Sequence, residues 1–199
     1  MQTRRRLFKK TLGGAALLAA AGAVPIALRP TKLRSPFRPL RFFTPAEYSV
    51  FAAVADRILA IEPTDATAVR PSAVQPSPRA PPPSPAEVDV AGKADAFLAP
   101  LDAASASDLK QLLALLDNAL FSLLGGGPAR PFTGMSAAEQ DRHLLAWSRS
   151  RLAVKRTGFQ ALKRLAGAIY FGSPATWASV GYAGPPYDLV RSVNAARER

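Results

Sequence analysis

The chain has 199 residues, of which 48% are hydrophobic, and a formal net charge of +12 at pH 7. It contains no cysteine, two methionines and one histidine. The lack of thiols excludes a cysteine-ligated iron–sulfur cluster, a c-type haem attachment motif and a disulfide. So few His and Met residues also argue against a dedicated metal site.

The positive charge is concentrated at the N-terminus. Residues 1–41 hold ten of the 26 Lys and Arg residues and none of the 14 acidic ones, so the rest of the chain has 16 basic and 14 acidic residues. A balance of +2 does not support a nucleic-acid footprint, and we expect no nucleic-acid partner. One later basic cluster is predicted to form a solvated helix face, with an acidic partner surface as the alternative: Arg149, Arg151, Lys155, Arg156, Lys163 and Arg164.

The first ten residues carry a sequence pattern typical of a twin-arginine export signal. Its elements are the pair Arg5 and Arg6, then Phe8 and Lys10. Such a signal is an address read by the twin-arginine translocase, which moves folded proteins across the bacterial cytoplasmic membrane. An uncharged apolar stretch follows directly, as in a signal peptide. Residues 1–28 are therefore predicted to be an export segment.

A retained membrane anchor is the alternative for the same segment. The apolar stretch from residue 11 to residue 28 is slightly short for a span of about 20 residues. It also contains three glycines and Pro25, and Ala21-Gly22-Ala23 resembles a cleavage site. These features favour a signal, although Val24 to Leu28 extend the apolar run beyond that site and leave cleavage open.

The next segments are expected to alternate between extended chain and helix. Residues 29–41 form a basic linker with three prolines, and Thr44-Pro45-Ala46-Glu47 then gives the capping box of a helix ending near Ala60–Ile61. Residues 62–90 are rich in proline, which favours neither helix nor central strand, so they are predicted to be a long surface loop.

Helical periodicity returns beyond this loop. We expect helices over residues 90–101 and 107–124, the second with a broad leucine face that is central to the core and a stop at Gly125-Gly126-Gly127-Pro128. Ser136 and Glu139 form a second capping box that opens a helix to about Arg156. Gly158 is expected to mark a break before a last helix to residue 172. His143 is expected to be an ordinary exposed helix residue rather than a metal ligand with Glu139.

The predicted fold class is all-α, a single domain over residues 42–199 with about five helices. Its C-terminal segment is rich in Gly, Pro and aromatic residues and is expected to be irregular. Trp177, Tyr182 and Tyr187 either cover the core of the domain or contact another subunit, because aromatic residues carry much of the energy of protein interfaces.

The chain resembles the gluconate 2-dehydrogenase subunit 3 family in three places. They are the twin-arginine leader, a first helix with Phe42-Phe43-Thr44-Pro45-Ala46-Glu47 and Ala55-Asp56-Arg57-Ile58, and a C-terminal pattern. That last pattern is Tyr170-Phe171-Gly172, Trp177, Gly181-Tyr182 and Gly184-Pro185. The Pro-rich insertion departs from the family pattern, which has a short turn after the first helix.

The resemblance implies a small, non-catalytic subunit of a membrane-associated dehydrogenase complex in the periplasm. Its partners would be a flavin-bearing large subunit of the glucose–methanol–choline type, which oxidises a sugar or sugar acid, and a multihaem cytochrome c subunit. This chain would itself hold no cofactor, since FAD and haem c would belong to the partners. It would carry the export signal for the large subunit and assist its maturation.

Within that reading, Phe42, Phe43, Trp177, Tyr182 and Tyr187 are the candidate partner-binding residues. The sequence contains neither a nucleophile elbow nor a dinucleotide-binding glycine pattern, and its single histidine leaves no plausible catalytic triad. The alternatives are a free-standing periplasmic or membrane-tethered helical binding protein and, less favoured, a small enzyme without cofactor.

Overall fold

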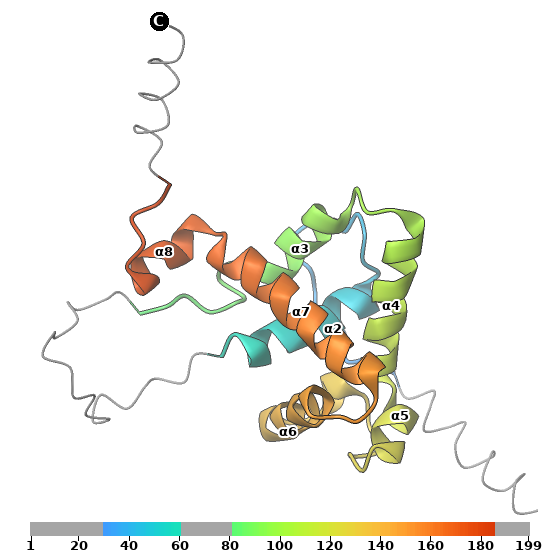
Figure 1. The fold of residues 1–199 in the computed structure, drawn as a ribbon. Helices are drawn as coiled ribbons and strands as arrows, with labels where there is room; N and C mark the ends of the chain where they lie inside the picture. Colours follow the sequence, from blue (N-terminus) through green and yellow to red (C-terminus); the bar gives the residue numbers. More distant parts are fainter. Residues whose placement is uncertain (1–29, 61–80, 186–199) are drawn as a thin grey trace, which may run out of the picture.

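The computed structural model describes residues 30–60 and 81–185, and all regular structure in these ranges is helical. The predicted all-α class is confirmed (Figure 1). In these ranges there are seven α-helices and a short 3-10 helix, η1, where about five helices were expected. Their bounds are α2 Pro45–Ile58, α3 Val90–Leu98, α4 Ala103–Asp117, α5 Ala119–Leu124, η1 Phe132–Gly134, α6 Ala137–Ser148, α7 Ala153–Phe171 and α8 Pro174–Val180.

Both predicted capping boxes are present. The Thr44 hydroxyl accepts a hydrogen bond from the Glu47 amide at 3.3 Å, and the Thr44 amide donates to the Glu47 carboxylate at 2.8 Å. Ser136 and Glu139 make the same reciprocal pair at the start of α6. Each box satisfies amides that the first helical turn leaves without a partner, so the local sequence fixes where these two helices begin.

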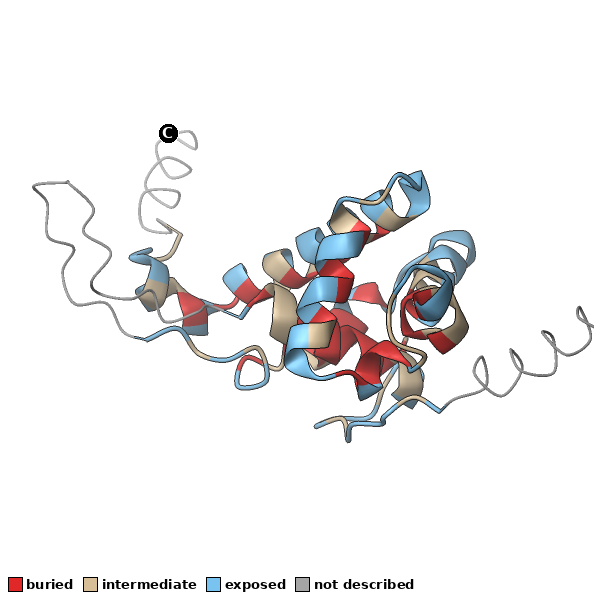
Figure 2. Cartoon of the chain, turned by 90° about the horizontal axis from the view of Figure 1, so that it is seen from below, coloured by how far each residue is buried: buried red, intermediate tan, exposed pale blue. Residues whose placement is uncertain are grey.

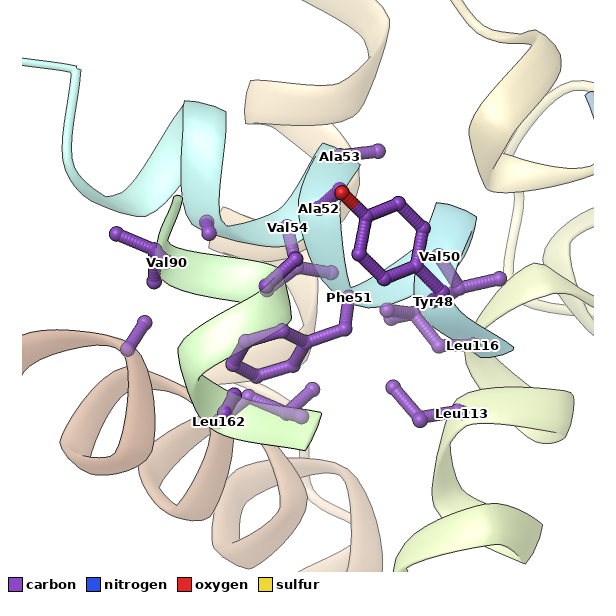
Figure 3. Close-up of a cluster of buried hydrophobic side chains, with 14 of the residues drawn as sticks. Tyr48, Val50, Phe51, Ala52, Ala53, Val54, Val90, Leu113, Leu116 and Leu162 are labelled. Atoms are coloured by element: carbon purple, nitrogen blue, oxygen red, sulfur yellow. The ribbon is translucent and has the colours of Figure 1, made fainter. Parts of the chain in front are cut away.

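The core is built around α2, which contacts α3, α4, α6, α7 and η1. Phe51 and Val54 of this helix are 0% exposed. Figure 3 shows Phe51 among side chains from α3, α4 and α7, including Leu113 and Leu162. Full burial of a side chain such as Phe51 contributes about 1.5–3 kcal/mol. Buried residues gather where the helices face each other, and the outer helix faces are exposed (Figure 2).

The leucine-rich segment does not form the single central helix that its pattern predicts. Asn118 interrupts it in an extended conformation and caps α5, accepting a hydrogen bond from the Phe121 amide at 2.9 Å. Leu113 and Leu116 reach the core, whereas Leu124 is 77% exposed. The broad apolar face is therefore divided between two helices, and α2 takes the central position.

The boundary between α6 and α7 also differs from the prediction. The break falls at residues 149–152, and Gly158 lies inside α7. A Cβ atom at Gly158 would collide with the side chain of Leu112 on α4. The glycine therefore permits close packing of two helices and does not end one.

The segment predicted as a basic linker is hydrogen bonded to the domain over its described part, residues 30–41. The Thr31 hydroxyl donates to the Asp117 carboxylate at 2.6 Å, and the Arg34 amide donates to the Ser49 hydroxyl at 2.8 Å. Arg34 also forms an ion pair with Asp56 on α2. These bonds hold the approach to the first helix against α2 and α4.

The end of the predicted Pro-rich loop is folded as well. Residues 85–89 form turns, and Val88 is 3% exposed. The hydroxyl of Tyr170, near the end of α7, donates to the Pro83 carbonyl at 2.6 Å. The loop is thus attached to α7 before the chain enters α3.

Candidate functional site

The predicted export residues, Arg5, Arg6, Phe8 and Lys10, lie outside the described residues, as does Tyr187. The assignment of residues 1–28 as an export segment therefore stays a prediction. Among the described residues, no helix combines the length and apolar character needed to cross a membrane.

The two phenylalanines before α2 have different surroundings. Phe43 is 4% exposed and its ring stacks on Phe51 with 5.7 Å between centroids. Phe42 is half-buried, and the Lys110 ammonium of α4 lies 5.0 Å from the centroid of its ring. The core covers Phe43 in this structure, and its assignment as a partner-binding residue stays a prediction.

The C-terminal aromatic unit, residues 171–185, is more ordered than expected. It contains the helix α8, which Pro174 opens in its first turn and Gly181 closes with a φ of 71°. Proline suits a first helical turn and glycine suits a left-handed closing residue, so the residues that suggested irregular structure delimit a helix here.

Thr176 attaches α8 to the end of α7. It is 0% exposed, and its hydroxyl lies 3.0 Å from the Tyr170 carbonyl and 2.9 Å from the Ser173 carbonyl. On α3, the Lys93 ammonium donates to the Ser173 hydroxyl at 2.9 Å. The unit is therefore held at its base, while the remainder of α8 extends from the bundle (Figure 1).

Trp177 organises the aromatic residues of the unit. Its indole N–H donates to the Phe171 carbonyl at 3.1 Å, and its ring meets that of Tyr182 edge-on with 5.3 Å between centroids. Gly184, with a φ of 101°, packs against the same indole, where a Cβ atom would be 3.0 Å from the ring. Trp177 and Tyr182 are thus brought together as one contact surface.

The unit leaves large apolar groups exposed to solvent: Phe171 at 49%, Val180 at 46% and Tyr182 at 48%. Phe42 is not part of this surface. It contacts α4, and α4 and α8 lie on opposite sides of the molecule in Figure 1. Trp177 and Tyr182 are in contact, and their role in binding a partner stays a prediction. Phe171 and Val180 are further exposed apolar residues of the same unit, which the sequence analysis did not single out as partner-binding residues.

The polar residues of the Ala55-Asp56-Arg57-Ile58 pattern in the first helix form ion pairs within the bundle. The guanidinium of Arg57 on α2 makes a two-pronged contact with the Asp141 carboxylate on α6, at 2.7 and 2.6 Å. Asp56 pairs with Arg34. In this structure these two polar residues join elements of the bundle.

The basic cluster predicted as one helix face is divided by the α6–α7 boundary. Arg149 and Arg151 precede α7, and the Arg156 guanidinium turns back to the carbonyls of Ser150 and Arg151 at 2.7 and 2.9 Å. Arg156 thereby closes the connection between the helices. Lys155 points to aromatic rings of α5 and α6.

Within the described ranges, no group of three or more His, Asp or Glu residues is placed to hold a metal ion. A scan of protein-family models, a search of curated proteins and a search of solved structures gave no match to this chain. The resemblance to the gluconate 2-dehydrogenase subunit 3 family thus stays a prediction from the sequence motifs.

Proposed function

We propose that this chain is a non-catalytic accessory subunit of an exported flavin-dependent dehydrogenase that acts on a sugar or sugar acid. It would carry the flavoprotein through the twin-arginine pathway to the periplasm and assist its maturation. The observation that carries the proposal is the Arg5-Arg6 export pattern, which directs proteins that are already folded and can therefore travel with a partner.

The C-terminal aromatic unit supports the proposal by supplying a surface for that partner. Tyr182 presents an apolar ring with a polar tip, and Trp177 holds the ring in place before binding. A surface fixed in advance loses less conformational freedom on association than a mobile one. Exposed apolar groups beside it, Phe171 and Val180, would be covered in the complex.

Replacing Arg5 and Arg6 together by Lys tests the export role. The receptor distinguishes the planar guanidinium pair from ammonium groups, so we expect both this chain and its flavoprotein to stay in the cytoplasm. Cell fractionation followed by immunoblotting of both proteins measures this. The matched control is Arg4→Lys, which removes a neighbouring arginine and leaves the pair intact. A flavoprotein that reaches the periplasm normally in the double variant would exclude the carrier role.

Replacing Tyr182 by Ala tests the surface. We expect the association with the flavoprotein to weaken by about 2 kcal/mol or more if Tyr182 is an anchor. Titration calorimetry of the purified subunits gives the affinity, and thermal unfolding of the isolated variant shows whether the bundle is intact. Phe37→Ala is the control, because Phe37 is 73% exposed but lies outside the unit. Equal affinities for both variants would place the interface elsewhere, first on the basic residues around Arg149–Arg156.

A further inference from the structure

A cavity of about 250 Å³ lies between the end of α5, α6 and the start of α7. Its walls combine polar and charged side chains with the glycine turn that follows α5. The polar and charged residues that matter here are Ser122, Glu139, Arg142, His143, Trp147 and Lys155. None of these positions belongs to the C-terminal aromatic unit.

Three residues that line this cavity each have a buried polar atom without a hydrogen-bond partner in the described protein: Ser122 Oγ, His143 Nε2 and Trp147 Nε1. Their residues are 2%, 8% and 1% exposed. The expectation that His143 is an exposed helix residue is therefore wrong. Buried polar atoms are nearly always hydrogen bonded because an unpaired one destabilises the fold, so three at one cavity indicate that something polar binds there.

A cation is held at the same place by aromatic rings. The Lys155 ammonium lies 4.4 Å from the Phe121 centroid and 5.8 Å from the Trp147 centroid. No carboxylate of the described residues lies within ion-pair distance of it, so its charge is left for a ligand. Glu139, the acidic member of the lining, is already engaged by the Ser136 cap and lies 3.7 Å from Arg130.

The protonation states favour a negatively charged ligand. Desolvation, followed by the charge of Lys155, lowers the pKa of His143 to about 4, so its imidazole is neutral at pH 7. The lining then carries two cations, Arg142 and Lys155, against the single carboxylate of Glu139. The indole N–H of Trp147 and the hydroxyl of Ser122 add neutral donors, and charge-assisted hydrogen bonds to an anion are the stronger kind.

The turn after α5 packs closely on the Ser122 hydroxyl. A Cβ atom at Gly127 would be 2.6 Å from Ser122 Oγ and would displace the hydroxyl. The rings of His143 and Trp147 also line the site. Small-molecule sites usually combine such apolar surfaces with a few polar groups.

We infer that this cavity binds a small organic carboxylate, with the carboxylate oxygens taken by Lys155, Trp147 and Ser122. A monoanion matches the single excess positive charge of the lining, and the cavity is smaller than typical drug-sized sites. The inference is independent of the proposed export function, because it depends on other residues and can be tested with the isolated chain.

The test uses the indole N–H signals of the two tryptophans in the full chain by NMR, with Trp177→Phe to assign them. Acetate is titrated at constant ionic strength, and acetamide serves as the uncharged molecule of the same shape. We expect a saturable shift of the Trp147 signal with acetate and at least about tenfold weaker binding of acetamide, because the charge-assisted bonds are lost.

Lys155→Met should weaken acetate binding by about tenfold or more, whereas Lys163→Met, the same change two turns further along α7, should leave it unaltered. Lys155→Arg keeps the charge and should retain binding within a few-fold, which separates loss of charge from loss of fold. The inference would be overturned by the lack of a saturable shift with acetate, by equal binding of acetamide, or by unchanged affinity in a folded Lys155→Met protein. Saturable binding of inorganic phosphate alone would likewise exclude an organic carboxylate as the ligand.

Discussion

Two groups of buried polar side chains differ sharply in this molecule. Asp95 of α3 and Asp117 of α4 are 3% and 8% exposed, and each carboxylate accepts three hydrogen bonds. Ser122, His143 and Trp147 are buried to a similar extent, yet each has a polar atom without a partner in the described protein. Side chains that are buried to a similar extent are therefore fully hydrogen bonded in the first group and contain an unpaired polar atom in the second.

The difference teaches which polar residues build the fold. Asp95 receives the amides of Arg41, Phe42 and Phe43 at 2.8, 3.0 and 2.7 Å, and so ties the approach to α2 to a helix far along the chain. His143 and Trp147 are instead positioned by ring packing, with 5.9 Å between their centroids. The aspartates serve the structure through their polar atoms, whereas the cavity residues are held by their apolar parts and keep those atoms for a ligand.

Replacing Asp95 by Ala should have the largest effect. The substitution leaves three amides without their acceptor, and we expect the free energy of unfolding to fall by about 3 kcal/mol or more. Urea denaturation followed by circular dichroism measures this. Asp108→Ala, an exposed aspartate on α4, should change the stability by no more than about 0.5 kcal/mol. Similar losses in both variants would contradict the structural role of Asp95.

The second largest effect should be the change of the free energy of unfolding with pH that His143 causes. Its pKa is about 4 in the folded chain against 6.5 for the free side chain, so between these values the unfolded chain binds the additional proton. This contribution to stability is complete above pH 6.5 and is lost as the pH falls through 4. We expect a loss of about 2–3 kcal/mol across that window.

His143→Gln isolates this contribution, because Glu139, Arg142 and Lys155, the charged groups that share the cavity, remain in both proteins. The measurement is the free energy of unfolding of each protein at several pH values from 4 to 7. The difference between the two curves should diminish towards low pH. A constant difference would show that His143 titrates alike in the folded and unfolded chains, and would count against its burial.

The sequence predicts the parts of the fold that depend on local chemistry. The capping boxes at Thr44 and Ser136 are four-residue patterns, and both helices begin where those patterns place them. The helix break at Asn118 was missed because the apolar periodicity continues through it. Asn is a good N-cap, so Asn118 could have indicated the start of a new helix, but the leucine periodicity predicts one continuous helix.

The cavity and the role of Asp95 could not be predicted in this way. The partners of Asp95 are backbone amides 52 to 54 positions away, and any sequence offers such amides. His143 and Trp147 are four residues apart and so share a helix face, which is a usable local signal. Ser122 lines the same cavity because α5 meets α6, where the Phe121 and Trp147 rings are in contact, and a single serine in a leucine-rich segment does not indicate that.

The smallest effects give the sharpest comparison, because two buried serines can be changed in the same way. Ser49, 0% exposed on α2, accepts from the Arg34 amide at 2.8 Å and donates to the Pro45 carbonyl at 2.6 Å. Ser122, 2% exposed on α5, has no hydrogen-bond partner for its hydroxyl in the described protein.

Both serines lie in helices, so the gain in helix propensity on replacement by Ala is similar and cancels between the two. Ser49→Ala should lower the free energy of unfolding by about 1–2 kcal/mol, because an amide loses its acceptor. Ser122→Ala should leave it unchanged or raise it by about 1 kcal/mol, because the variant lacks a buried hydroxyl that has no partner. Parallel urea denaturation of both variants without added carboxylate measures the contrast. Equal losses would mean that the Ser122 hydroxyl is satisfied in the free protein, and the distinction between fold-building and ligand-binding polar groups would then fail at this residue.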